Sequence, residues 1–127
     1  WISFKGNLFM SVFFEINTGT SIKNITFNNC EIIRKSIQKF TKNKIKIKPP
    51  NDLLINNEKI CGILQETFFQ NKKKFIVVGI GLNLVKSPKI KKYPTNYLNK
   101  YTSKKISKLM LFRSIKCLYE KKINYLI

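Results

Sequence analysis

The sequence predicts an α+β fold, with a mixed, mainly antiparallel sheet that carries its helices on one face. Along the chain the patterns run strand, helix, several consecutive strands, helix, and that order favours this layer arrangement. Turn sequences separate the strand patterns, and no internal repeat or low-complexity linker interrupts them. The 127 residues suffice for one core, so we expect a single domain over residues 1–127.

The first half of the chain contains a strand, a helix and a second strand. Residues 8–16 are rich in aromatic and branched side chains, which predicts a buried strand. A turn at 17–20 leads into residues 22–40, where apolar side chains recur near helical spacing and lysines occupy the other face. Isoleucine alternates with lysine over 44–48, as in a half-buried strand, and Pro49-Pro50 ends its pairing.

The second half begins with a run of strands. A strand starts at 53–55, Asn56-Asn57 supplies left-handed turn residues, and the return strand covers 59–69. Residues 70–72 turn again, and 75–84 form an apolar strand that ends in glycines.

The remainder of the chain is a basic loop followed by a helix. The loop covers residues 86–102 and contains two prolines. Ser103 is the expected cap of the last helix, which has a broad apolar stripe.

The formal net charge of +19 raises the question of a nucleic-acid or anionic partner. Of the 25 basic residues, all but Arg34 and Arg113 are lysine, whereas arginine is the usual reader of bases and phosphates. The lysines are spread over the whole chain. A lysine-rich composition with solvated faces therefore explains the charge better than a nucleic-acid site.

Histidine and cysteine usage narrows the possible chemistry. The chain has no histidine, which excludes Ser-His-Asp and Cys-His nucleophile systems and most zinc catalysis. Three widely spaced cysteines, each in apolar surroundings, predict buried free thiols rather than disulfides, and hence a reducing cytoplasm. No apolar run approaches the roughly 18 residues of a membrane span.

Three short segments hold the candidate site residues, and each has two interpretations. Asn51-Asp52 is either a turn pair or an acid that holds a lysine. Lys59 is either a solvated edge-strand lysine or a cation that Asp52 holds across a hairpin, beside a glycine that lets a ligand approach. Gly79-x-Gly81-x-Asn83 is either a β-bulge or a cleared platform for a flat ligand that Asn83 binds.

In combination these segments resemble the catalytic domain of biotin protein ligases. That family has K-W-P-N-D, then K-x-x-G-I-L, then G-x-G-x-N, in this order and at similar spacing. The resemblance is strong over residues 1–15 and 44–85, and rests only on helical pattern beyond 103. The counterparts in this chain are Lys48–Asp52, Lys59–Leu64, Gly79–Asn83, and upstream Trp1-x-Ser3, Gly6-Asn7-Leu8 and Ser11.

The resemblance implies an enzyme that joins biotin and ATP into biotinyl-5′-AMP and then biotinylates a lysine of the biotin carboxyl carrier protein of acetyl-CoA carboxylase. Mg²⁺ would accompany ATP, and a homodimer through a sheet edge is possible. Lys59 would contact the biotin carboxylate and α-phosphate, and Asp52 would position Lys59 and help to activate the acceptor lysine. The backbone of Cys61, Gly62 and Ile63 would line the biotin pocket. The implied nucleotide-binding residues are Trp1, Lys48, Asn51, Gly81 and Asn83.

The chain departs from the family pattern in two ways. Pro49 stands where the family has tryptophan. The chain begins at Trp1, so the glycine-arginine loop that the family places just before W-x-S is not in this sequence. We therefore expect a fragment of the catalytic domain that is weak or inactive by itself.

Three other interpretations remain. A lipoate or octanoyl transferase shares the fold family and a similar K-x-x-G context. A basic nucleic-acid-binding module would use interleaved aromatics such as Tyr93, Tyr97 and Tyr101, although their spacing equally fits a helix packing stripe. The third is a purely structural remnant.

Overall fold

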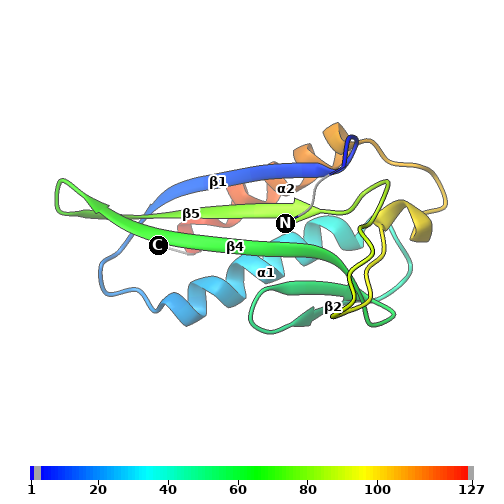
Figure 1. Ribbon diagram of the computed structural model, residues 1–127. Coiled ribbons are helices and arrows are strands. Elements are labelled where there is room, and N and C mark those ends of the chain that lie inside the picture. The colour runs from blue at the N-terminus through cyan, green and yellow to red at the C-terminus, as the bar shows by residue number, and fades with distance from the viewer. Residues whose placement is uncertain (2–3, 126–127) are drawn as a thin grey trace.

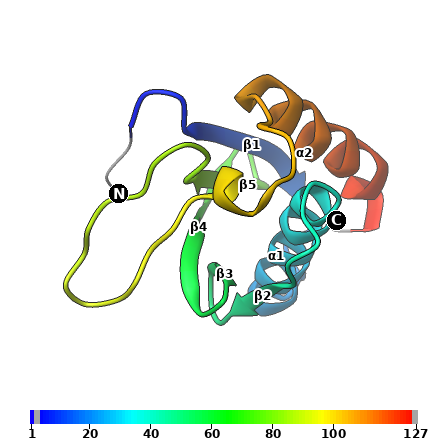
Figure 2. The same ribbon diagram turned by 90° about the vertical axis from the view of Figure 1, so that its right-hand side faces the viewer.

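The computed structural model describes residue 1 and residues 4–125. Five strands form one sheet in the order β1-β5-β4-β3-β2, and two helices cover one of its faces (Figures 1 and 2). The other face, called the open face here, carries no helix. The elements are β1 (Leu8–Ile16), α1 (Ile22–Gln38), β2 (Ile45–Lys48), β3 (Asp52–Ile55), β4 (Glu58–Gln70), β5 (Lys73–Leu82), η1 (Leu98–Tyr101), α2 (Lys108–Lys122) and η2 (Ile123–Tyr125).

The expected α+β class, strand order along the chain and placement of the helices are confirmed. Neighbouring strands all pair antiparallel, and the parallel component is limited to a bridge between Lys59 and Thr95. The predicted turns are confirmed too, since Asn56, Asn57 and Asn71 have positive φ. No helix in the described part of the chain is long and apolar enough to cross a membrane.

The last helix starts later than predicted. Ser103 does not cap it; the Ser107 hydroxyl instead accepts from the Met110 backbone N–H at 3.2 Å, and α2 begins at Lys108. The reason lies in the preceding loop, where the Asn99 side chain bonds both the N–H and the C=O of Ile106. Those bonds hold the backbone of buried Ile106 outside the helix. The short helix η1 also interrupts the predicted loop.

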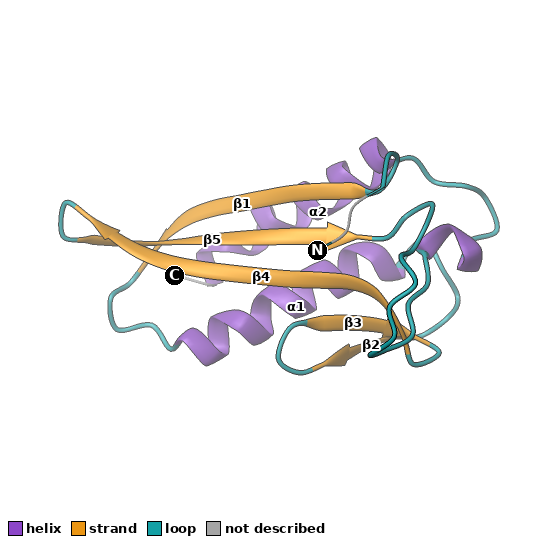
Figure 3. Ribbon diagram, in the orientation of Figure 1, coloured by secondary structure: helices purple, strands orange, loops and turns teal. Residues whose placement is uncertain are grey.

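The three tyrosines at fourfold spacing do not form a helical stripe. Tyr101 lies in η1, Tyr97 immediately precedes it, and Tyr93 belongs to the irregular segment between β5 and η1. Figure 3 draws the segment that follows β5 as a loop.

A buried polar chain fixes the helices on the sheet. The Tyr119 hydroxyl of α2 donates to Asn29 Oδ1 of α1 at 2.8 Å, and Asn29 Nδ2 donates to Gln65 Oε1 of β4 at 3.1 Å. Asn29 is fully buried, so its amide needs both partners. Desolvation raises the pKa of Tyr119 well above its usual range, and this tyrosine therefore acts as a neutral donor.

We expect Tyr119→Phe to lower the free energy of unfolding by about 1–3 kcal/mol, because the buried Asn29 oxygen loses its donor. Urea denaturation followed by circular dichroism measures the change. The half-buried loop residue Tyr97 supplies the control, since Tyr97→Phe should shift stability by less than about 0.5 kcal/mol. Equal effects of the two substitutions would contradict this account of the network.

Candidate active site

A β-bulge in β4 brings the lysine and glycine of the K-x-x-G segment onto one face. In a regular strand, residues three apart point to opposite faces. Here Leu53 pairs with Cys61 but Leu54 pairs with Lys59, so Ile60 is an extra residue. Ile60 and Cys61 both enter the core, and Lys59 lies on the open face beside Gly62. The bulge expected at Gly79–Gly81 is absent, because β5 keeps a continuous register with both neighbours.

Lys59 forms an ion pair with Asp52. Its Nζ lies 3.0 Å from Asp52 Oδ1, and the two side chains are only 15% and 24% exposed. The interpretation of Lys59 as a solvated edge lysine is wrong, since β3 lies on one side and residues 94–96 on the other. Its backbone N–H donates to Pro94 O and its carbonyl accepts from the Asn96 N–H, both at 3.0 Å. The loop thus fixes the backbone that carries the candidate cation.

Two aromatic rings also face the ammonium group. Lys59 Nζ lies 5.5 Å from the ring centroid of Trp1 and 5.1 Å from that of Tyr93. Aromatic faces attract cations at such distances. Asp52, Trp1 and Tyr93 together hold a cation on the open face with limited exposure to water.

Two glycines make room for the Trp1 indole. Gly62 pairs with Gly81 across β4 and β5. A Cβ at Gly81 would lie 2.6 Å from Trp1 Cε2, and one at Gly62 would lie 2.9 Å from Trp1 Cζ3. Both separations are too short for any side chain. The pair Gly62–Gly81 therefore carries the flat ring of Trp1, whereas the sequence interpretation expected a ligand over Gly79 and Gly81.

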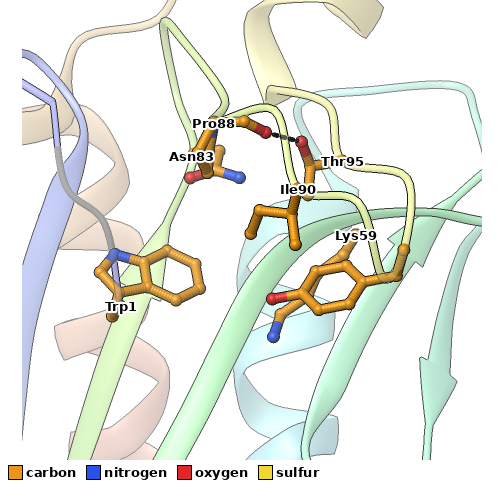
Figure 4. Close-up of a pocket in the computed structure, with 7 residues that line it drawn as sticks. Trp1, Lys59, Asn83, Pro88, Ile90 and Thr95 are labelled. Atoms are coloured by element: carbon orange, nitrogen blue, oxygen red, sulfur yellow. Dashed lines mark hydrogen bonds between the residues drawn. The ribbon is translucent and has the colours of Figure 1, made fainter.

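Pockets lie on both sides of Trp1 and Lys59. The larger one, about 280 Å³, rests on the open face of the sheet and includes the Asp52–Lys59 pair. The smaller one, about 120 Å³, lies under the loop that follows β5, where Trp1, Lys59, Ile90 and Asn83 surround it (Figure 4). The two pockets share Trp1 and Lys59, so the cation is accessible from both.

Asn83 presents an unsatisfied acceptor in the smaller pocket. Its side chain is 1% exposed, and its Nδ2 donates to Asn96 O at 3.3 Å. Within the described residues, its Oδ1 has no hydrogen-bond partner. A buried oxygen without a donor is costly, so this atom is suited to a ligand N–H.

Asn7 ties the start of β1 to the chain that leaves β5. Its Oδ1 accepts from the backbone N–H groups of Leu84, Val85 and Lys86 at 2.9–3.3 Å, and its Nδ2 donates to Lys86 O at 2.8 Å. This contact explains the asparagine of the Gly6-Asn7-Leu8 segment. It anchors the loop that covers the smaller pocket.

Most of the predicted site residues meet at these pockets. Cys61, whose backbone was expected to line the biotin pocket, is an exception because it lines neither pocket. Lys48 is exposed on β2, opposite Asp52, and lines neither pocket. Ser3 lies outside the described residues. The residues brought together are Trp1, Asn51, Asp52, Lys59, Gly62, Ile63 and Gly81 in the larger pocket, and Asn83 with Trp1 and Lys59 in the smaller one.

The sequence interpretation missed residues of the loop and of the neighbouring strands. Pro88, Ile90, Tyr93 and Thr95 line the smaller pocket, and Phe9 and Leu64 line the larger one. Phe9 lay within the strand predicted over residues 8–16, but its exposure and its pairing with Gly81 are evident only in the structure. No feature of the neighbouring sequence indicates that Tyr93 belongs to the site. The loop that carries Tyr93 comes close to Lys59 only through its hydrogen bonds to β4.

The cysteines show no sign of being nucleophiles. Burial raises the pKa of Cys30 to about 11, and burial also raises that of Cys61 far above its usual range. Both are buried free thiols, as predicted, but Cys117 is exposed, against expectation. The Cys30 thiol donates to Pro50 O at 3.6 Å, which is a structural contact.

The shifted thiol pKa values predict alkaline destabilisation. Unfolded thiols ionise near pH 8.5, whereas Cys30 in the fold stays protonated until about pH 11. Its contribution to stability is therefore complete below about pH 8.5 and is lost as the pH rises towards 11. We expect the urea midpoint of Cys30→Ala to fall less between pH 8 and 10.5 than that of the parent chain. Cys117→Ala, at an exposed thiol, is the control, and identical slopes for all three proteins would contradict the linkage.

Comparison with known proteins shows the family of the chain. The pattern of the Biotin/lipoate A/B protein ligase family matches residues 1–83. Biotin–protein ligase 2 of Arabidopsis thaliana is 32% identical over 90 residues, which are 66% of this chain and 27% of that protein. The chain belongs to the Biotin/lipoate A/B protein ligase family.

Solved structures share the fold. The Leishmania major biotin protein ligase in complex with biotinyl-5-AMP superposes with a TM-score of 0.76 at 19% identity, over 98% of this chain and 57% of that one. The Aquifex aeolicus biotin protein ligase with biotin and ATP gives 0.70 at 23% identity, over 96% and 53%. The chain thus spans little more than half the length of these structures.

Proposed function

We propose that this chain belongs to an ATP-dependent biotin protein ligase. Such an enzyme makes biotinyl-5′-AMP from biotin and ATP and transfers biotin to a lysine of a biotin carboxyl carrier domain. The observation that carries the proposal is the Asp52–Lys59 pair, 3.0 Å apart, between two pockets that share the cation. Family membership and the biotinyl-5-AMP and ATP complexes of the structural neighbours support it.

Lys59 would stabilise the charge that develops during adenylation. The biotin carboxylate attacks the α-phosphorus of ATP, one P–O bond forms, another breaks, and pyrophosphate leaves. A preplaced cation on the α-phosphate lowers the energy of that transition state. Asp52 holds the ammonium in position, and the two aromatic rings limit its hydration.

The smaller pocket would bind the adenine. Asn83 Oδ1 can accept from the exocyclic amino group, which would satisfy the buried oxygen. The Trp1 indole can pack against the flat base, and Asn51 would approach the adenylate from the larger pocket. Biotin would lie in the larger pocket, near the backbone of Gly62 and Ile63. No group of three metal-binding side chains occurs among the described residues, so Mg²⁺ would enter on the phosphates of ATP.

In the transfer step, the acceptor lysine attacks the acyl carbon of biotinyl-5′-AMP. An amide bond forms, the acyl–phosphate bond breaks and AMP leaves. Asp52 would help to remove the proton from the attacking amine. The acceptor would be the carrier protein of acetyl-CoA carboxylase. The free thiols of the chain support a reducing compartment, and we place the protein in the cytoplasm.

Ligand binding tests the proposal directly. We expect calorimetry to show binding of biotin, and tighter binding of a non-hydrolysable biotinyl-adenylate analogue, with lipoate unable to displace either. Adenosine monophosphate alone serves as the control for the nucleotide half. Preferential binding of lipoate would move the chain to the lipoate branch of the family. Salt-sensitive binding of nucleic acid without biotin binding would favour the basic-module alternative.

A further inference from the structure

The open face carries an apolar patch beyond the site, at the far end of the long strands. Strand pairing places Phe13 and Val77 in one row and Phe75 and Phe68 in the next. Three of the rings stack, with centroids 5.3 Å apart for Phe13 and Phe75 and 5.6 Å apart for Phe68 and Phe75. Phe13 is 57% exposed although it lies mid-strand. We call Phe13, Phe68 and Phe75, with the adjoining Glu15 and Glu66, the phenylalanine patch.

The charge of this patch is opposite to that of the chain. Strand pairing assigns nine open-face positions to β1, β5 and β4 between the rows of Ser11 and Glu15, and none is lysine or arginine. Two of the six acidic residues of the chain, Glu15 and Glu66, do lie there. Within residues 1 and 4–125, neither takes part in an ion pair. In a chain of net charge +19, an exposed cluster of aromatic rings without lysine or arginine around it indicates an interaction site rather than a solvated face.

The patch is continuous with the candidate active site. Phe9 and Leu64 line the larger pocket and lie on the same face of the sheet. Phe9 pairs with Gly81 in the row of the glycine pair, and Leu64 lies one row nearer the phenylalanines. Phe75 lies six positions before Gly81 in β5, which is about 20 Å along a strand. A standard interface covers about 800 Å² of each partner. A single docked domain can therefore touch the phenylalanines and still reach Lys59.

We propose that the phenylalanine patch docks the acceptor protein of the transfer step. This inference rests on the proposed function. The complementary surface would present apolar side chains together with lysine or arginine, which pair with Glu15 and Glu66. The larger pocket lies on the open face, so an acceptor lysine arrives from this side. A second copy of the chain fits less well, because a symmetric contact would set these carboxylates against each other.

Binding of an unmodified biotin carboxyl carrier domain tests the proposal. Phe13→Ser with Phe68→Ser should weaken its binding about tenfold or more, as expected for aromatic anchors, and leave biotin affinity unchanged. Phe69→Ser is the matched control, because Phe69 is 65% exposed on the same strand but points to the helix face. Thermal melting confirms that each variant is folded.

Charge reversal provides a second, independent test of carrier docking. Glu66→Lys and Glu120→Lys raise the net charge equally, but only Glu66 lies in the patch, so only Glu66→Lys should weaken carrier binding. Equal carrier affinity in parent, patch and control variants, or no carrier binding by a chain that binds biotin, would overturn the docking proposal. Failure to bind biotin would instead count against the proposed function.

Discussion

Replacing Lys59 with glutamine is expected to weaken binding of the biotinyl-adenylate analogue about 10- to 100-fold, the loss of one charge-assisted hydrogen bond. The substitution removes the ammonium but keeps much of the side chain that runs past Gly62. It also leaves the Asp52 carboxylate facing an anionic ligand. Isothermal titration calorimetry measures the affinity.

Asp52→Asn separates the two contributions to that loss of affinity, which are the missing ammonium group and the repulsion between the Asp52 carboxylate and the ligand. If Asp52 acts through Lys59, Asp52→Asn alone should weaken binding modestly. The double variant should bind better than Lys59→Gln alone, because the repulsive carboxylate is gone. The sum of the single effects would then exceed the double effect, as coupled neighbours require.

Lys46→Gln is the matched control for net charge. Lys46 is exposed on the open face of β2 and lines neither pocket, so its removal should change the affinity by less than about twofold. Equal affinities of the parent chain and Lys59→Gln would exclude Lys59 from the adenylate site.

The segments that carry the site could be predicted from sequence, but their geometry could not. Polar and glycine residues at the ends of apolar runs indicated where Asp52, Lys59 and the glycine pair lie. Whether Lys59 and Gly62 share a face depends on the bulge at Ile60. That bulge has no local signature. It is held by the bond from the Asn83 N–H to Ile60 O at 2.8 Å, a contact between distant segments.

The same limit explains the errors near the C-terminal end. Ser103 and Ser107 are equally good caps by residue type. Ser107 is the cap because the Asn99 side chain binds the backbone of Ile106 and holds that residue outside the helix. Likewise, Tyr93 became part of the site because the loop pairs with Lys59 at Pro94 and Asn96. In both cases the sequence pattern allowed more than one local structure, and hydrogen bonds between distant segments determine which one forms.

Gly81→Ala is expected to keep the fold and lose the ligand site. The φ of Gly81 is not in the left-handed region, so alanine fits the strand and should preserve or slightly raise stability. Its Cβ would nevertheless overlap the Trp1 indole, 2.6 Å from Cε2. Trp1 is 54% exposed and can move away, which would take the ring from the platform and from the Lys59 ammonium. We expect the analogue to bind up to about tenfold more weakly, since a lost aromatic ring contact costs about 0.5–1.5 kcal/mol.

Intrinsic fluorescence follows the displacement directly, because Trp1 is the sole tryptophan of the chain. Gly81→Ala should shift its emission to longer wavelength as the indole becomes more hydrated. Gly79→Ala is the matched control on the same face of the same strand, where a Cβ meets only Leu64 O at an ordinary 3.5 Å. That variant should keep the emission of the parent chain; it is a control for the indole position and not for affinity, because Gly79 also lines the larger pocket. Unchanged emission in Gly81→Ala would mean that the glycine pair does not position Trp1, and the platform would then have to act on the ligand alone.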